Sequence, residues 1–147
     1  MTCNQLNIII ADDDADDQLL IKEAIRHYAR EAELISVTDG AELLKWVTQV
    51  SEDRVQKTKP DIIILDLNMP RMDGITALTK IKAIEYCRDI PVYILTTSKD
   101  EEDKRRCSEL GARRFFTKPS GFGSLQASIK TIIGDVKPEN KVTQYEQ

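Results

Sequence analysis

Residues 60–74 read PDIIILDLNMPRMDG, and this stretch decides the fold. The branched aliphatic residues 62–65 follow one another without a polar residue between them. Such an unbroken apolar run is typical of a strand buried on both faces, as in a parallel sheet. Asp66 follows the run directly, at the carboxyl edge where open α/β sheets bind their ligands. An acid at such a position can also be only a helix cap or a turn former. Pro70 and the pair Asp73-Gly74 then predict a turn before the next helix.

On either side of this strand, apolar runs alternate with segments of helical spacing. The runs predict further strands at residues 6–11, 34–37, 92–95 and 114–117. Apolar residues that recur every three or four positions predict a helix after each strand, around residues 14–28, 43–47, 75–84, 99–110 and 125–133. Strand–helix units of this length predict an α/β fold: one parallel sheet with helices on both faces.

The ends of the predicted helices carry their own signals. The acids among residues 14–17 suit the positive end of the first helix dipole. Ser98, with Glu101 three residues later, fits a capping box for the fourth helix, and Gly111 fits its end. The last helix is expected to stop near Gly134.

The fourth predicted helix has few apolar residues. Between residues 99 and 111 it offers only Cys107 and Leu110 as apolar anchors, and the other predicted helices carry more. Because buried apolar area stabilises by roughly 25 cal/mol per Å², so narrow a stripe predicts a weakly held helix. We therefore expect this helix to move most easily.

Polar side chains follow four of the predicted strands, each just past an apolar run. They are Asp12, Asp13, Asp66, Thr96 and Lys118. In a parallel sheet these strand ends share one edge, so we expect the side chains to converge. Three carboxylates in one crevice repel one another unless a cation joins them, and oxygen ligands suit Mg²⁺. The lysine and the threonine are donors suited to phosphoryl oxygens.

The composition narrows the class of protein. A chain of 147 residues with a net charge of −4 is long enough for one domain with a real core, and it does not favour binding to nucleic acid or an anionic membrane. No stretch approaches the roughly 18 apolar residues of a membrane helix, and no secretory signal is present. Cys3, Cys87 and Cys107 match neither a zinc site nor a disulfide framework, which fits a reducing cytoplasm.

Together, the strand-end motifs resemble those of a known family. Asp12-Asp13, residues 66–70 with Asp73-Gly74, Thr96 and Lys118-Pro119 are similar to the motifs of the receiver domain of two-component response regulators. The resemblance covers about residues 6–134 and implies a flavodoxin-like five-stranded sheet with strand order 2-1-3-4-5. Residues 135–147 are polar, without periodicity, and are expected to form a flexible tail.

The resemblance implies a role for each acid. Asp66 would accept a phosphoryl group from a sensor histidine kinase or a phosphotransfer protein, giving an aspartyl-phosphate. Asp13, Asp66 and the backbone carbonyl of Asn68 would bind Mg²⁺ directly, and Asp12 would act mainly through water. The chain would then be a phosphoacceptor switch and not an enzyme, with Mg²⁺-dependent self-phosphorylation and slow self-dephosphorylation at most.

The resemblance also implies a switch and an output surface. Lys118 would pair with the phosphoryl group, Thr96 would swing toward it, and Phe115 would be the aromatic switch residue. The face formed by the fourth helix, fifth strand and fifth helix would bind a kinase, an unnamed downstream protein or a second copy of the chain. Members of the family often have a cis peptide at the position of Lys118-Pro119, so a cis bond is expected here.

Some positions depart from the usual family pattern. Thr97 stands where a very small residue is common, which narrows access to the phosphoryl site. Phe115 lacks the hydroxyl of the commoner tyrosine, so the switch would work by packing alone. The connection at residues 51–59 is long. Single-domain regulators paired with phytochrome-type kinases often share this connection and the Thr-Thr-Ser run at residues 96–98.

Other functions use similar residues. A haloacid-dehalogenase-type phosphatase also combines a strand-end aspartate with Mg²⁺, but it needs a second acid where this chain has Asn68. A receiver-like binding module would have lost phosphorylation, although every acid and the lysine are present here. A calcium-binding loop would use Asp12, Asp14, Asp16 and Glu23, but Asp17 stands where that loop needs glycine.

Overall fold

The fold is a single parallel sheet, seen in a computed structural model that describes residues 5–119 and 122–136. Its strands are β1 (Asn7–Ala11), β2 (Glu33–Val37), β3 (Ile62–Leu65), β4 (Val92–Thr96) and β5 (Arg114–Thr117). The strand order is β2-β1-β3-β4-β5, and each pair of neighbours is parallel. The predicted flavodoxin-like fold is therefore confirmed.

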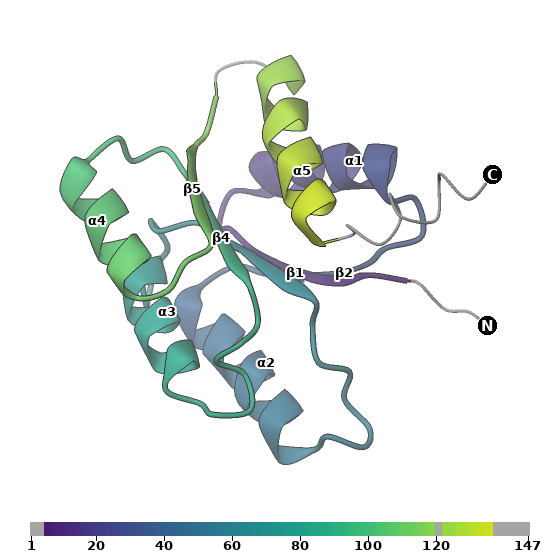
Figure 1. Cartoon of the computed structure of the whole chain (residues 1–147), viewed down its shortest axis with the longest axis vertical. Helices are drawn as coiled ribbons and strands as arrows, with labels where there is room; N and C mark the ends of the chain where they lie inside the picture. Colours follow the sequence, from purple (N-terminus) through teal and green to yellow (C-terminus); the bar gives the residue numbers. More distant parts are fainter. Residues whose placement is uncertain (1–4, 120–121, 137–147) are drawn as a thin grey trace.

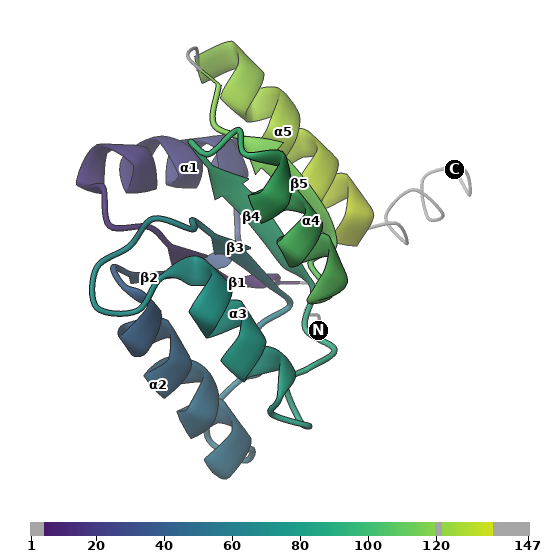
Figure 2. The ribbon, with the colours of Figure 1, turned by 90° about the vertical axis from the view of Figure 1, so that its left-hand side faces the viewer.

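Helices cover both faces of the sheet (Figures 1 and 2). Helices α1 (Ala15–Tyr28) and α5 (Phe122–Val136) lie on one face. Helices α2 (Gly40–Glu52), α3 (Gly74–Lys82) and α4 (Glu101–Glu109) lie on the other. Within the described residues, no helix is long and apolar enough to cross a membrane.

Strand β3 belongs to two hydrophobic cores at once. Ile63 and Leu65 pack toward α2 and α3, while Ile62 and Ile64 pack toward α1 and α5. All four side chains are at most 1% exposed. A strand with apolar neighbours on both faces needs no polar alternation, which is why this run of the sequence has none.

The register of the sheet brings the strand ends to the same edge, with β4 extending two residues beyond the end of β3. Ala11 at the end of β1 pairs with Leu65 at the end of β3. On the other side, Thr96 at the end of β4 pairs with Thr117 at the end of β5. The residues that follow these ends therefore emerge at one edge of the sheet.

Helix α4 begins later than the sequence predicted. Asp100 is its N-cap, and the Asp100 carboxylate accepts a hydrogen bond from the Glu102 N–H. The predicted capping box of Ser98 with Glu101 is wrong, because the Ser98 hydroxyl donates to the Asp103 carboxylate instead. The predicted end is confirmed: Gly111 has φ +98° and its N–H donates to the Ser108 carbonyl.

Two further details differ from expectation near the C-terminus. Helix α5 continues past Gly134 to Val136. A glycine costs a helix only about 1 kcal/mol, and Asp135 beyond it accepts hydrogen bonds from Tyr93 and Arg114. The predicted cis bond at Lys118-Pro119 is also wrong, because the described residues contain no cis peptide. The flexible tail was expected to begin at residue 135, but residues 135 and 136 belong to α5, and the remainder of the expected tail lies outside the described residues.

Candidate functional site

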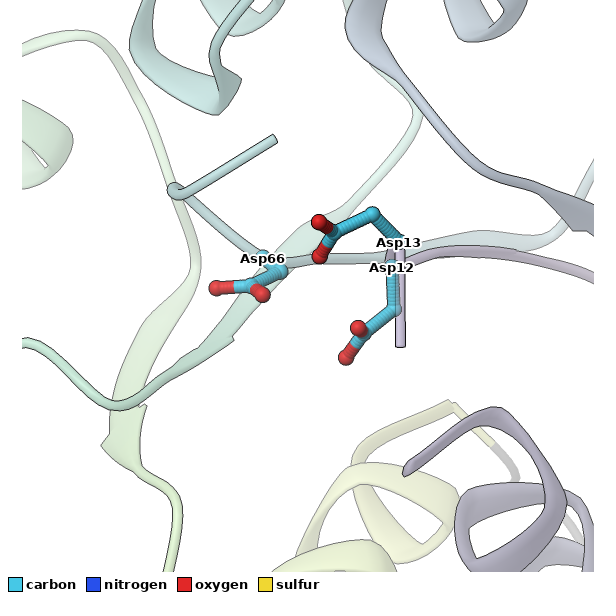
Figure 3. Close-up of side chains that lie close together, drawn as sticks. All are labelled: Asp12, Asp13 and Asp66. Carbon is cyan, nitrogen blue, oxygen red and sulfur yellow. The ribbon is translucent and has the colours of Figure 1, made fainter. Parts of the chain in front are cut away.

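Three aspartates meet at the carboxyl edge of the sheet. Asp12 and Asp13 follow β1, and Asp66 follows the neighbouring strand β3. One carboxylate oxygen from each lies within 4.8 Å of the others (Figure 3). Asp12 and Asp66 are only 1% and 5% exposed, whereas Asp13 is exposed. An all-oxygen cluster that is open on one side has the ligand chemistry that Mg²⁺ prefers.

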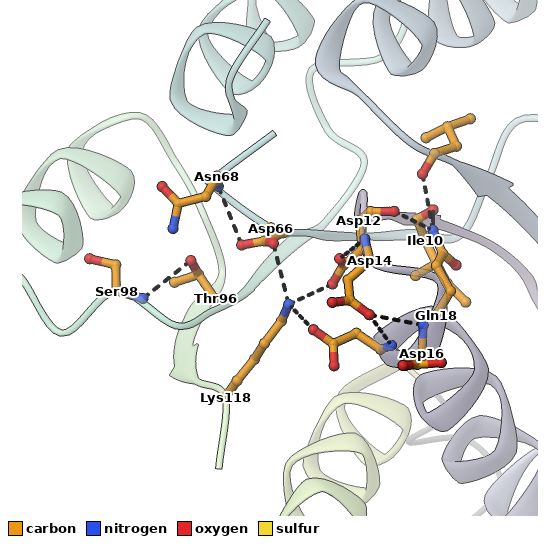
Figure 4. Close-up of polar contacts among 12 residues, drawn as sticks. Ile10, Asp12, Asp14, Asp16, Gln18, Asp66, Asn68, Thr96, Ser98 and Lys118 are labelled. Atoms are coloured by element: carbon orange, nitrogen blue, oxygen red, sulfur yellow. Dashed lines mark hydrogen bonds and ion pairs between the residues drawn. The ribbon is translucent and has the colours of Figure 1, made fainter. Parts of the chain in front are cut away.

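Lys118 reaches into this cluster from the end of β5. Its ammonium Nζ lies 2.7 Å from Asp12 Oδ2, 2.7 Å from Asp17 Oδ2 and 3.3 Å from Asp66 Oδ2 (Figure 4). The lysine side chain is only 12% exposed. The structure thus joins strands β1, β3 and β5 and helix α1 through one ammonium group.

Burial and neighbouring charges shift the pKa values of Asp12 and Lys118. Burial raises the pKa of the Asp12 carboxyl above its ordinary value, although the Lys118 ammonium acts in the opposite direction. Burial alone would lower the pKa of Lys118, but Asp12, Asp17 and Asp66 hold it above its ordinary value. Lys118 is therefore a fixed positive charge beside Asp66 at neutral pH.

The loop after β3 is held by a close backbone approach at Gly74 and by an ion pair at Arg71. The Asn68 N–H donates to Asp66 Oδ1 at 3.4 Å. A Cβ added at Gly74 would lie 2.3 Å from the Asp66 carbonyl oxygen, so only glycine permits this close approach. On the other side, Arg71, with φ +66°, pairs with the buried Asp39 carboxylate at 2.8 Å. The backbone that carries Asp66 and Asn68 is therefore closely held.

Thr96 is connected to helix α4 by hydrogen bonds. Thr96 is fully buried at the end of β4, and its hydroxyl accepts from the Ser98 N–H at 3.4 Å. The Ser98 hydroxyl in turn donates to Asp103 in the first turn of α4 at 2.8 Å. Phe115 is partly buried and packs against the core on the same side of the sheet. The hydroxyl of Thr96 is thus linked to α4 through a single intervening residue.

Two residues of α1 take part in the site without having been predicted. Asp17 binds Lys118, although its position at a helix start indicated only a favourable contact with the helix dipole. Gln18 is 6% exposed, and its amide nitrogen lies within hydrogen-bond distance of the carbonyls of Ile10, Asp12 and Val37. The sequence did contain a signal for Gln18, because this polar residue occupies a position of the helix that helical spacing places on the buried side. Gln18 joins the ends of β1 and β2 beneath the acids.

The sequence of the chain matches a known protein family and several of its members. A family model described as the response regulator receiver domain matches residues 8–130. The response regulator Rcp1 of Synechocystis sp. is 31% identical over 125 residues, which cover 85% of this chain and 84% of Rcp1. The transcriptional regulatory protein PrrA of Mycobacterium leprae is 30% identical over 126 residues, which cover 86% of this chain and 49% of PrrA. The chain thus spans about half the length of PrrA.

Several solved structures have a similar fold. The phosphorylated cyanobacterial phytochrome response regulator RcpA has a TM-score of 0.80 and 32% identity, covering 88% of this chain and 92% of RcpA. The Mn²⁺-bound form of Rcp1 has a TM-score of 0.78 and 30% identity, with the same coverages of 88% and 92%. The bacteriophytochrome response regulator RtBRR has a TM-score of 0.70 and 31% identity over 86% of this chain and 76% of RtBRR.

Proposed function

Because the chain belongs to the response regulator receiver domain family, we propose that it is a phosphoacceptor switch phosphorylated on Asp66. Receiver domains take phosphoryl groups from histidine kinases and bind Mg²⁺ or Mn²⁺ at an acidic pocket. The observation that carries the proposal is the position of Asp66: it is 5% exposed, within reach of two further aspartates and 3.3 Å from a buried lysine. The proposed unit runs from residue 6 to the end of α5.

The proposed reaction moves one phosphoryl group. A carboxylate oxygen of Asp66 attacks the phosphorus, a P–O bond forms, and the P–N bond to the donor histidine breaks. The imidazole leaves with the electron pair of that bond and takes up a proton. Because phosphoryl transfer depends mainly on in-line placement and charge neutralisation, Lys118 contributes by holding its positive charge beside the oxygen that attacks.

Magnesium has a fitting site among the same residues. Asp13, Asp66 and the Asn68 carbonyl would hold the ion, with Asp12 acting through water. The support is the all-oxygen cluster whose carboxylates lie within 4.8 Å of one another. When bound, the ion would offset charge on the phosphoryl oxygens.

The output of the switch is proposed to leave through α4, β5 and α5. Cys107 is the single buried residue of α4, and Leu110 at its end is partly buried. A groove of about 190 Å³ between α4 and β5 includes Lys104, Cys107 and Phe115 in its lining. Thr96 drawn toward the phosphoryl group would shift α4 through Ser98, and Phe115 would repack. A kinase, a downstream protein or a second copy of the chain would bind this face in the cytoplasm.

Labelling with acetyl phosphate tests the proposal. In the presence of Mg²⁺, the wild-type protein should gain the mass of one phosphoryl group, and Asp66→Asn should keep the fold but gain none. Asp16→Asn is the matched control, because Asp16 is an exposed acid near the site with no side-chain contact to Lys118 in the described residues. A wild-type protein that stays unlabelled by acetyl phosphate and by histidine kinases would contradict the proposal and favour a receiver-like binding module.

A further inference from the structure

We propose that Asp17 is a positioning residue for the phosphoacceptor site, which orients the Lys118 ammonium toward Asp66. The inference rests on the proposed function and adds a residue to it. Asp17 lies outside the strand-end motifs and comes from the first turn of α1. It reaches the site only because the fold brings it to a lysine 101 positions later in the chain.

The three carboxylates around Lys118 differ in how they bind it. Asp17 Oδ2 accepts a hydrogen bond of 2.7 Å, and Asp66 Oδ2 accepts a longer one of 3.3 Å. Asp12 Oδ2 also lies 2.7 Å from the ammonium, in an ion pair with a carboxylate that is almost fully buried. Of the two hydrogen bonds that Lys118 donates to Asp17 and Asp66, the one to Asp17 is therefore the shorter and stronger.

Asp17 is itself firmly placed. Its backbone N–H donates to the Asp14 carboxylate at 3.0 Å, which fixes the first turn of α1. The Asp17 side chain is 34% exposed, whereas those of Asp12 and Asp66 are 2% and 6% exposed, so Asp17 is the carboxylate around the ammonium that lies nearest to solvent. A capped helix end is a rigid support compared with the long lysine side chain that it holds.

The geometry of an ammonium group explains what this contact does. Lysine has three N–H donors in a tetrahedral arrangement. Two of these donors serve the hydrogen bonds to Asp17 and Asp66, and Asp12 is paired with the same ammonium group. Without Asp17, the ammonium can rotate and settle between Asp12 and Asp66, where it is no longer aimed at a phosphoryl oxygen. Small misplacements of this kind are costly in transfer reactions.

The test compares the rate of labelling by acetyl phosphate in matched variants. Asp17→Ala should be labelled roughly tenfold more slowly than wild type, as expected for the loss of one charge-assisted hydrogen bond. Asp17→Asn keeps an oxygen acceptor and should recover most of the rate. Asp16→Ala, which removes the neighbouring exposed acid, should match wild type. In a Lys118→Ala background, Asp17→Ala should have no further effect.

A second measurement, which needs no phosphodonor, tests whether Asp17 holds the Lys118 ammonium group. In nitrogen-15 NMR of the lysine ammonium groups, Lys118 should show slowly exchanging protons in the wild-type and Asp16→Ala proteins. Asp17→Ala should lose this protection. Equal protection in Asp17→Ala, or labelling as fast as that of Asp16→Ala, would overturn the role of Asp17. If the wild-type protein were not labelled at all, the proposed function would fail, while the NMR result would still show whether Asp17 holds Lys118.

Discussion

At the scale of single residues, Gly74 shows how the backbone excludes a side chain near Asp66. A Cβ at this position would lie 2.3 Å from the Asp66 carbonyl oxygen and 2.7 Å from the Leu67 Cα. Both are backbone atoms, so an added methyl group must displace the loop that carries the acceptor. The packing of the loop therefore leaves room only for glycine at position 74.

We predict that Gly74→Ala lowers the free energy of unfolding by about 1–3 kcal/mol, the usual cost of overpacking. Gly123→Ala is the control, because a Cβ at Gly123 meets nothing within 4 Å and a helical alanine is favoured over glycine. Urea denaturation measures both. A Gly74→Ala protein as stable as Gly123→Ala would show that the loop is not tightly packed.

Asp39 gives a residue-scale prediction for pH. The Glu42 N–H and the Arg71 guanidinium lower the pKa of Asp39 below its ordinary value of 3.8. The ionised carboxylate therefore stabilises the fold above pH 3.8, and this contribution is lost as the pH falls through the lower pKa of the folded state. The stability difference between wild type and Asp39→Asn should hold from pH 7 down to about pH 4 and shrink as the pH is lowered further, toward about pH 2. A constant difference over this range would contradict the assignment.

At the scale of elements, α4 differs from the other helices on its face of the sheet. It buries only Cys107, whereas α2 buries Gly40, Leu43, Val47 and Val50. Helix α4 is also the one joined to Thr96 through Ser98. A weakly anchored element with a direct polar link to the site is the part of the fold most easily shifted.

We predict that a beryllofluoride phosphate mimic changes amide hydrogen exchange in α4 and β5, and leaves α2 unchanged. The reason is that α2 has a wide buried stripe and no hydrogen bond to Thr96 in the described residues. Ser98→Ala, which removes the hydroxyl bonded to Asp103, should reduce the change in α4. Exchange effects restricted to the loops around Asp66 would contradict this coupling.

At the scale of the whole molecule, most of the fold could be predicted from the sequence. Unbroken apolar runs and helical spacing located the strands and helices, and the carboxyl-edge rule brought Asp12, Asp66 and Lys118 together. The role of Asp17 was not predicted, because its partner Lys118 lies 101 residues later in the chain. Helical spacing shows which face of a helix is buried, but not which distant side chain contacts Asp17. The end of α5 was missed for the same reason, since Asp135 is bound to Tyr93 and Arg114.

Metal binding is predicted to stabilise the whole fold. An ion that binds only the folded state adds about 2.7 kcal/mol at a concentration 100 times its dissociation constant. Mg²⁺ should therefore raise the melting temperature of the wild-type protein and of Asp16→Ala. Asp13→Ala should lose most of this shift, because it removes one of the three clustered carboxylates. A full shift in Asp13→Ala would exclude Asp13 as a ligand.

Mapping the phosphorylated residue shows directly whether Asp66 is the phosphoacceptor. Borohydride reduces an aspartyl-phosphate to homoserine, so the modified position can be read by peptide mass spectrometry after phosphorylation by acetyl phosphate or a histidine kinase. We predict homoserine at residue 66 and nowhere else, since Asp66 lies beside Lys118 at the end of the central strand. Homoserine at residue 12 or 13 with residue 66 unmodified would contradict it.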